Sequence, residues 1–351
     1  MTIIYSIIAS VFIVCLAITP IVIKIAKKYN LVDIPKDARR VHNKPMPRVG
    51  GIAIVISMFI GLGIYYIITK NIPSIALNEK FLGFLLGGII IFAMGLIDDI
   101  FNLKARYKFL FQLVAALVVY IFGIRISGIK IPFIYTDIIN FGWLDLPITL
   151  LWIIGITNAI NLIDGLDGLS SGIALISCVS MLIIFAINGS PIIAILLITA
   201  LAGAISGFLP FNFNPAKTFM GDAGSNFLGY CLSVISIFGV AKTYTLVVVV
   251  APLIVLGLPV VDTIVAIFRR IIKGKSIKAI MQADKGHLHH RLLKMGFSQR
   301  EAVLIMYAIT AALGLFAIVL LESGIWKAIS FLILVVAIIA IGYKNFEKER
   351  S

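Results

Sequence analysis

The sequence predicts an all-α protein that crosses a membrane many times, and two features of its composition lead to this fold class. Of the 351 residues, 61% are hydrophobic and only 13% are charged, whereas an ordinary soluble domain has roughly 45–50% apolar and 25% charged residues. The hydrophobic residues also occur along the whole chain, in runs close to the roughly 20 residues that span a bilayer core of about 30 Å. These two features exclude a soluble globular enzyme.

Apolar runs bounded by helix-interrupting residues predict eleven transmembrane helices in one integral-membrane domain, residues 1–351. In chain order we expect helices at 3–24, 49–69, 81–97, 107–124, 146–163, 169–187, 191–209, 225–241, 246–268, 301–320 and 327–342. A charged residue, an asparagine or a proline ends each run and so sets its boundary.

The basic residues predict the orientation of these helices, because Lys and Arg collect in cytoplasmic loops. About 22 Lys and Arg lie in one set of loops and about 5 in the other. With an odd number of spans, we expect the N-terminus outside, the C-terminus in the cytoplasm, and a multi-pass protein of the cytoplasmic (inner) cell membrane. The basic set comprises 27–48, 98–106, 164–168, 210–224, the His/Arg-rich loop 269–300 and the tail from Tyr343.

The ionisable residues predict that the functional face is cytoplasmic. The net charge of +14 does not indicate a nucleic-acid partner, because the basic residues lie between apolar runs and not on one folded face. Ionisable groups near the hydrocarbon are costly and therefore suggest function by default. Those expected in cytoplasmic loops or at cytoplasmic helix ends are Asp98, Asp99, Asp164, Asp167, Asp222, Asp284, His42, His287, His289 and His290.

Two adjacent carboxylates, Asp98 and Asp99, end the third apolar run. Like charges repel and a bilayer boundary desolvates them, so we expect a divalent cation or a basic partner to stabilise the two carboxylates. Lys104 and Arg106 are close enough in sequence to be that partner. The alternative interpretation is a pair of acidic residues that caps a loop beside its cations.

A second motif follows at the end of the fifth run, where Asn158, Asn161 and Asp164 recur every third residue. On a helix this spacing stacks the three side chains on one stripe, and Asp167 follows in the next loop. A plain helix-to-helix turn explains the Asp-Gly pairs, but it does not explain paired asparagines in an apolar span. An EF-hand is excluded because the later calcium ligands are missing.

The segment 210–225 opens the eighth run with small residues, including Gly221 and Asp222. Backbone N–H groups at such a helix start can approach an anion, and Asp222 could hold a cation on that anion. We interpret the segment, which includes Lys217, as a site for phosphate and metal. A simple N-cap by Asp222 or Ser225 accounts for part of the pattern only.

Three histidines occur within four positions of the loop 269–300. A zinc site there is disfavoured by the neighbouring cations and the lack of cysteine ligands, whereas imidazole, Arg and Lys are all donors suited to phosphate oxygens. A similar basic loop contains His42, although that loop could serve only as the positive anchor of two spans. The expected phosphate donors are His42, His287, His289, His290 and Arg291.

These motifs together suit the binding of metal-bridged phosphates at a bilayer surface. They combine carboxylates, amides, a glycine-rich helix start and a rim of basic residues. Such a site can bring together a lipid phosphate and a soluble nucleotide derivative. An ion-coupled transporter is the alternative from another class of protein. Transporters place such residues near the midplane between inverted repeats, and here the residues cluster at one face.

Five motifs in order resemble the polyprenyl-phosphate N-acetylhexosamine-1-phosphate transferases, over nearly the whole chain. The branch that it most resembles transfers N-acetylglucosamine 1-phosphate from UDP-N-acetylglucosamine to undecaprenyl phosphate. The muramoyl-pentapeptide branch is similar through its carboxylates but has a different histidine-rich loop. The chain departs from the expected pattern at Ala283 and Lys285. The motifs are Val32 to Gly51, Asp98-Asp99, Asn158 to Gly168, Phe219 to Ser225, and His287-Leu288-His289-His290-Arg291.

This resemblance implies roles for residues of this sequence. Catalysis is expected from Asp98, Asp99, Asp164, Asp167 and Asp222, with Mg²⁺, or Mn²⁺ as a substitute, held chiefly by Asp222 and further by Asp98, Asp99 and Asp164. Direct displacement and a covalent intermediate both stay open, as does a homodimer. The expected substrate-binding residues are His42, Asn158, Asn161, Lys217, Gly221, His287, His289, His290 and Arg291.

Overall fold

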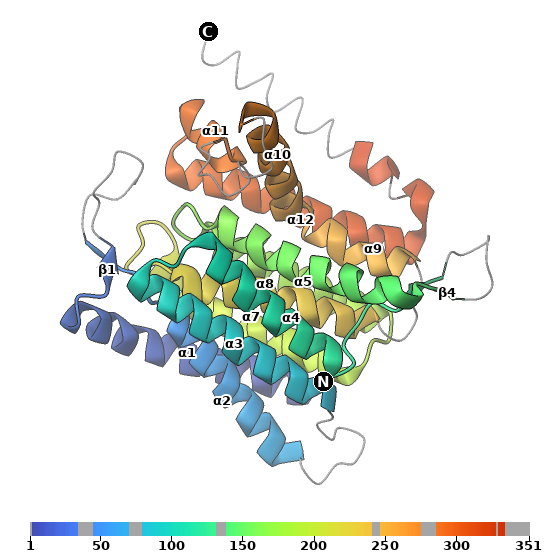
Figure 1. Ribbon diagram of the computed structural model, residues 1–351, viewed down its shortest axis with the longest axis horizontal. Helices are drawn as coiled ribbons and strands as arrows, with labels where there is room; N and C mark the ends of the chain where they lie inside the picture. The colour runs from blue at the N-terminus through green and yellow to red at the C-terminus, as the bar shows by residue number, and fades with distance from the viewer. Residues whose placement is uncertain are drawn as a thin grey trace.

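The computed structural model describes residues 2–33, 45–69, 79–130, 138–240, 246–274, 286–327 and 329–333. Long helices that lie side by side make up most of this part of the chain (Figure 1). Seven of the described helices are long and apolar enough to cross a membrane, and an eighth span results if one bent pair is counted. The predicted class, an all-α multi-pass membrane protein, is confirmed at this level.

The helices begin and end close to the predicted boundaries for most of the chain. They are α1 (Thr2–Lys28), α2 (Gly51–Thr69), α3 (Glu79–Phe101), α4 (Ala105–Ile121), α5 (Asp145–Ile163), α6 (Leu169–Ile187), α7 (Ile192–Asn212), α8 (Gly221–Val240), α9 (Leu246–Val255), α10 (Gly257–Gly274), α11 (Leu288–Lys294) and α12 (Gln299–Ser323). A short 3₁₀ turn, η2 (Gly142–Leu144), precedes α5. Of the last predicted helix, 327–342, residues 328 and 334–342 lie outside the described residues.

Two small antiparallel hairpins interrupt the helical pattern. Strand β1 (Val32–Asp33) pairs with β2 (Met46–Pro47), and β3 (Gly128–Ile129) pairs with β4 (Ile139–Asn140). The backbone beside β2 is tied to the segment before α8, because the N–H of Phe219 donates to the carbonyl oxygen of Pro47 at 2.8 Å. The first hairpin therefore places Arg48 next to the start of α8.

Helix α8 is the central element of the bundle. Its side chains from Ala223 to Val240 are all buried, and it packs against α2, α3, α5, α6 and α7. Small residues allow this close packing in a membrane protein. A Cβ added at Gly51 would lie 2.3 Å from the Cα of Gly224, so the starts of α2 and α8 are in backbone contact.

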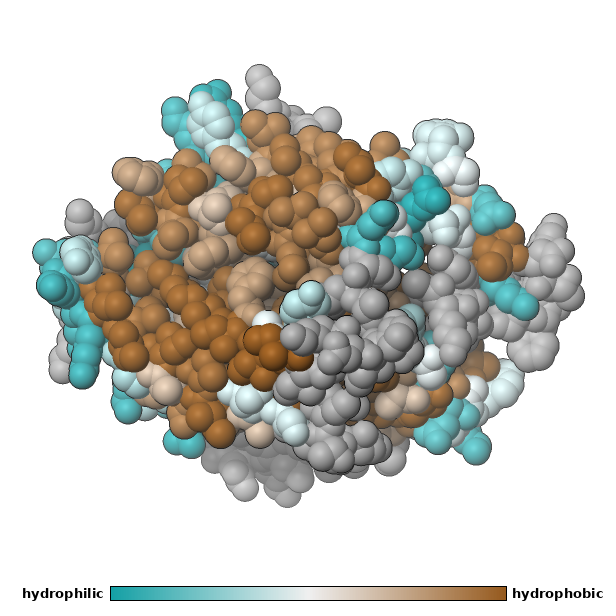
Figure 2. Space-filling view, turned by 90° about the horizontal axis from the view of Figure 1, so that it is seen from below, coloured by the Kyte–Doolittle hydropathy of each residue, from teal (hydrophilic) through white to brown (hydrophobic). Residues whose placement is uncertain are grey.

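One face of the bundle is broadly apolar. Figure 2 shows one face covered broadly by hydrophobic side chains, and α1 and α2 expose Ile13, Ile21, Ile60 and Ile64. A helix that presents such side chains outward can contact lipid without a polar covering. The surface agrees with the membrane interpretation of the composition.

The prediction of one continuous ninth helix, 246–268, was wrong. The structure divides it into α9 and α10, which meet at an angle of 75°. Pro259 explains the break, because proline has no N–H to donate to the carbonyl oxygen of Val255 four residues earlier. In Figure 1, α10 and α11 stand out from the bundle on the side of α12.

Candidate active site

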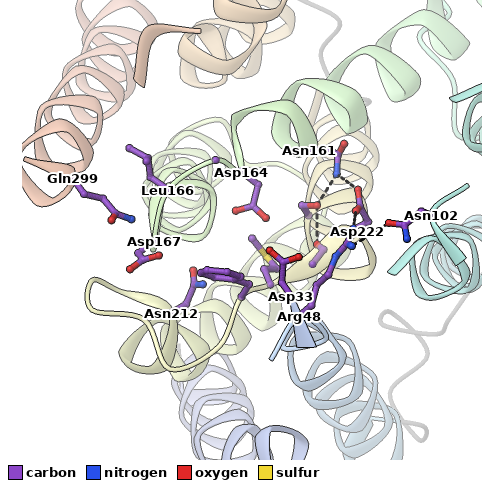
Figure 3. Close-up of a pocket in the computed structure, with 15 residues that line it drawn as sticks. Asp33, Arg48, Asn102, Asn161, Asp164, Leu166, Asp167, Asn212, Asp222 and Gln299 are labelled. Atoms are coloured by element: carbon purple, nitrogen blue, oxygen red, sulfur yellow. Dashed lines mark hydrogen bonds and ion pairs between the residues drawn. The ribbon is translucent and has the colours of Figure 1, made fainter. Parts of the chain in front are cut away.

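The ends of several helices surround one cavity of about 410 Å³. The end of α5, the start of α8 and the loops beside α3 and α6 contribute to its wall. Figure 3 shows that the side chains lining the cavity come from elements far apart in the sequence. Its charged and amide lining residues include Asp33, Arg48, Asn161, Asp164, Asp167 and Asp222.

Asp99 occupies the N-terminus of α8. Its carboxylate accepts hydrogen bonds from the backbone N–H groups of Asp222, at 2.8 Å, and Ala223, at 2.9 Å. A carboxylate is favourable at this position because the first N–H groups of a helix have no partner within it. The N–H groups that we expected to bind a phosphate are therefore satisfied by a residue of the chain itself.

Gly221 allows this close approach. Its φ of +74° lies in the left-handed region, which a residue with a Cβ adopts only at a cost. A Cβ at this position would also lie 2.1 Å from the carbonyl oxygen of Arg48 and 2.6 Å from Oδ2 of Asp99. The structure thus gives Gly221 a backbone role at the wall of the cavity.

Arg48 lies between two carboxylates. Its Nε is 3.1 Å from Oδ1 of Asp99, and its Nη2 donates to Oδ2 of Asp222 at 2.8 Å. The same guanidinium donates through Nη1 to Oδ1 of Asn102 at 3.3 Å. Such charge-assisted contacts are stronger than neutral hydrogen bonds, so Arg48 balances much of the negative charge at the start of α8.

Lys108, on α4, is the basic partner of Asp98. Its Nζ forms an ion pair with Oδ2 of Asp98 and lies 3.5 Å from Oδ1 of Asp222. The other Asp98 oxygen accepts from the backbone N–H of Leu103 at 2.7 Å, and the residue is only 1% exposed. The expectation of Lys104 or Arg106 as the partner was wrong, since the turn into α4 directs Lys108 back toward the end of α3.

The two asparagines of α5 reach different surroundings. Asn161 donates to Oδ1 of Asp222 and to the Ser225 hydroxyl, each at 2.8 Å. Asn158 lies one turn deeper and donates to Oε1 of Gln112 at 2.7 Å. Gln112 in turn donates to Oδ1 of Asn226 at 3.1 Å. A buried chain of amides therefore joins α4, α5 and α8 beneath the cavity.

Asp164 faces the cavity directly. In Figure 3 its carboxylate points into the space between Asp167 and Asp222. Burial, followed by the negative charge of Asp222, raises the pKa of Asp164 to about 8. Within the described part of the chain, no hydrogen bond or ion pair involves this carboxylate, so it is available to a bound group.

Asp167 has a structural partner in the segment before α8. Its Oδ2 accepts from Nδ2 of Asn214, at 3.0 Å, and from the backbone N–H of Ala216, at 3.1 Å. These bonds hold the irregular stretch 213–217 against the loop that follows α5. Lys217, in this stretch, is exposed beside the ring of Phe211 and does not line the cavity.

None of the histidines of the loop 269–300 lines the cavity. Nδ1 of His287 is 2.8 Å from Oδ2 of Asp262, and Oδ1 of the same carboxylate accepts from the N–H of Leu288. His289 packs on the loop after α5, since a Cβ at Gly165 would lie 2.5 Å from its Nε2. Burial, followed by the neighbouring His290, lowers the pKa of His289 to about 3.

The remaining predicted binding residues either do not line the cavity or lie outside the described residues. Arg291 is exposed on α11 and lines a separate, smaller cavity beside α10. His290 is half-buried, and its ring centroid lies 4.2 Å from that of His289, with the two rings tilted by 46°. His42 lies outside the described residues.

The chemistry of the cavity suits a hard divalent cation, although no ligand set is assembled. Carboxylate oxygens are the ligands that Mg²⁺ prefers, and Asp164 and Asp222 both face the cavity. Among the described residues, no three His, Cys, Asp or Glu side chains are grouped so that they could hold a metal ion. Instead, Arg48 and Lys108 supply the positive charge that the carboxylates require.

Sequence reasoning missed Arg48, Lys108 and Gln112. Lys108 and Gln112 had a visible signal, because polar residues inside an apolar run are costly and therefore suggest a role. Arg48 had none of that kind, since it lies in a loop where basic residues are expected anyway. Its contact with Asp222 joins positions 174 residues apart.

Comparisons with known proteins agree with this geometry. A family model described as glycosyl transferase family 4 matches residues 81–240, the stretch that contains the carboxylates from Asp98 to Asp222. The chain is 41% identical over 321 residues to a Bacillus subtilis protein named probable undecaprenyl-phosphate N-acetylglucosaminyl 1-phosphate transferase, covering 92% of this chain and 86% of that protein.

More distant relatives carry related names. A Mycolicibacterium smegmatis decaprenyl-phosphate N-acetylglucosaminephosphotransferase is 35% identical, covering 81% of this chain and 73% of that protein. The Escherichia coli K12 undecaprenyl-phosphate alpha-N-acetylglucosaminyl 1-phosphate transferase is 29% identical, covering 84% of this chain and 78% of the relative. These similarities extend over the great majority of each chain.

Proposed function

The chain belongs to glycosyl transferase family 4 and is a membrane phosphotransferase, and from this premise we propose its reaction. It transfers N-acetylglucosamine 1-phosphate from UDP-N-acetylglucosamine to undecaprenyl phosphate and releases UMP. The reaction starts the synthesis of a cell-envelope polysaccharide or of a teichoic acid linkage unit. The observation that carries this proposal is the position of Asp222, which faces a polar cavity and is held by Arg48, Lys108 and Asn161.

The residues of the cavity act by holding charge and position. A phosphate monoester has a second pKa near 6, so the lipid acceptor is mostly dianionic at neutral pH and gains little from a general base. Phosphoryl transfer depends mainly on alignment and electrostatic stabilisation. Arg48 and Lys108 therefore neutralise phosphate and carboxylate charge, while Asn161 and Asp99 hold Asp222 in place.

The carboxylates of the cavity would hold a divalent cation, Mg²⁺ or Mn²⁺. When bound, it would neutralise phosphate oxygens and, as a Lewis acid, polarise a phosphoryl oxygen. Asp222 and Asp164 would hold it, since both carboxylates face the cavity. Asp98 and Asp99 would have to exchange their ion pairs with Lys108 and Arg48 to become additional ligands.

The orientation of the protein belongs to the same proposal. We place the cavity at the cytoplasmic surface of the inner membrane, with eleven spans, the N-terminus outside and the C-terminus inside. The distribution of Lys and Arg among the loops supports this orientation. Soluble UDP-N-acetylglucosamine then reaches the cavity from the cytoplasm, and the lipid phosphate reaches it from the inner leaflet.

The test uses the full chain purified in detergent. With UDP-N-acetylglucosamine, undecaprenyl phosphate and Mg²⁺, we expect UMP release that stops when a chelator removes the metal. Asp222→Asn should lose at least about a hundredfold in rate, the scale for one essential electrostatic group, while remaining in the membrane. Retained turnover with ordinary Mg²⁺ dependence would contradict the role of Asp222.

Donor comparison separates the alternatives. The same assay with UDP-N-acetylmuramoyl-pentapeptide tests the muramoyl branch, and other UDP-N-acetylhexosamines test the sugar. Faster turnover of any of these would replace the proposed donor. Ion-dependent solute uptake into vesicles, without UMP release from any donor, would favour a transporter.

A further inference from the structure

Arg48 is held in the place where the proposed function requires a cation. We propose that Arg48 and the divalent cation compete for the Asp222 carboxylate, so that cation binding releases the guanidinium to the phosphate groups of a nucleotide in the same cavity. Arg48 is in this sense a coupling residue between metal binding and nucleotide binding. The inference rests on the proposed function for the presence of the cation and the nucleotide.

The contacts of Asp222 create the competition. Its Oδ2 accepts from Nη2 of Arg48 at 2.8 Å, and its Oδ1 accepts from Asn161 and lies 3.5 Å from Nζ of Lys108. Both oxygens are thus occupied by donors of the chain itself. A cation that takes Oδ2 needs the lone pairs that Arg48 now uses, and its charge repels the guanidinium.

The surroundings of Arg48 allow its side chain to move while its backbone stays fixed. Hydrogen bonds from Phe219 to Pro47 and from Gly50 to Phe219 hold the main chain on either side, at 2.8 and 2.9 Å. The Arg48 side chain is 25% exposed and lines the cavity. A rotation of the side chain would carry the guanidinium away from Asp222 and Asp99 into the cavity without moving the hairpin.

Lys108, unlike Arg48, does not line the cavity. Its Nζ is paired with Asp98, which is nearly inaccessible, and Asp222 is the more distant of its two partners. The two cations also differ in chemistry, because the planar guanidinium can donate two parallel hydrogen bonds to a phosphate and an ammonium cannot. Of these two residues, Arg48 is the one suited to exchange a carboxylate for a phosphate.

The proposal predicts opposite changes in two affinities. Replacing Arg48 by Gln removes the competitor, so Mn²⁺ alone should bind more tightly. The same replacement removes a phosphate donor, so UDP should bind more weakly. A residue that only supports the fold would weaken both affinities or neither.

The experiment measures Mn²⁺ binding to the full chain in detergent by electron paramagnetic resonance, without nucleotide, and UDP binding by calorimetry at saturating Mn²⁺. For Arg48→Gln we expect Mn²⁺ affinity to rise about fivefold and UDP affinity to fall about tenfold, within the usual range of coupling between sites. Arg48→Lys should keep Mn²⁺ affinity near that of the original chain but still weaken UDP.

Arg106→Gln is the matched control, because it removes the same charge from an exposed residue whose guanidinium contacts Tyr107 outside the cavity. It should leave both affinities unchanged. Mn²⁺ binding that is unchanged or weaker in Arg48→Gln overturns the proposal, and so does a gain of the same size in Arg106→Gln. Neither measurement needs the lipid acceptor or turnover. A negative result in the transferase assay can therefore be distinguished from a negative result in these two binding measurements.

Discussion

The Asp99 carboxylate accepts a hydrogen bond from the backbone N–H of Asp222 at 2.8 Å. One carboxylate of the candidate site thus fixes the helix that carries another. A second bond, from the N–H of Ala223, completes the cap of α8. Because α8 is buried along its length in the centre of the bundle, this cap links the electrostatics of the cavity to the stability of the fold.

Asp99→Asn should therefore destabilise the protein more than Asp222→Asn. The amide cannot provide the negative charge that the helix N-terminus favours, and one of its two terminal atoms no longer accepts a hydrogen bond. We expect a loss of about 1–2 kcal/mol in the free energy of unfolding, as for other lost helix caps. Thermal unfolding of both variants in detergent measures the difference. An equal melting temperature for the two variants contradicts the capping role.

Gln112→Leu should break the amide chain beneath the cavity. The substitution leaves Asn158 and Asn226 without this partner, and each unsatisfied buried polar group costs about 1–3 kcal/mol. Chemical denaturation in detergent should show the loss. Val114→Leu is the control, because Val114 is exposed on the same helix. A Gln112→Leu chain as stable as this control shows that the amide chain contributes nothing.

The sequence was sufficient for most helix boundaries because charge and hydropathy change sharply there. Helix α6 covers Leu169–Ile187, the predicted range. The bend between α9 and α10 was not predicted, although Pro259 lies next to it. Hydropathy reports how apolar a segment is. It gives no information about the direction in which a helix continues. A proline in an apolar run marks a weak point, and the surrounding packing decides how far the helix bends.

The candidate site was predictable where its members share one local motif. The three-residue spacing placed Asn161 on the same helix face as Asp164, and the structure brings Asn161 to 2.8 Å from Asp222. The partners of the carboxylates were not predictable in the same way. The packing of α2, α4 and α8 brings Arg48 and Lys108 to these carboxylates. No local sequence pattern indicates which basic residue contacts which acidic residue.

Tyr307→Phe should weaken the link between α12 and the loop that contains Asp167. The Tyr307 hydroxyl donates to the carbonyl oxygen of Gly168, and a Cβ at Gly172 would lie 1.9 Å from the tyrosine ring. Loss of the hydroxyl alone should cost about 1 kcal/mol in stability, and Tyr307→Ala should cost about 3–5 kcal/mol because a cavity remains. Thermal unfolding orders the variants. A Phe variant less stable than the Ala variant contradicts this assignment.

The stability of the segment around α11 should fall in mild acid because of His289. An unfolded histidine has a pKa of about 6.5, and burial, followed by His290, lowers the pKa of His289 to about 3 in the folded chain. Between these values the unfolded state binds a proton that the folded state does not, so stability decreases as the pH falls below about 6.5. The expected loss is about 2 kcal/mol between pH 6.5 and pH 5.

His289→Asn should remove this part of the pH dependence, whatever it does to stability at neutral pH. His290→Asn should retain it, because His290 is half-buried. The measurement is the melting temperature of each chain in detergent at pH 7, 6 and 5. The comparison uses only the change in melting temperature between pH values. A loss of stability that is the same at every pH, such as one from the cavity that Asn leaves, therefore does not affect the result. If the original chain and His289→Asn lose the same stability between pH 7 and pH 5, other groups cause the acid sensitivity. In that case folding does not lower the pKa of the His289 imidazole.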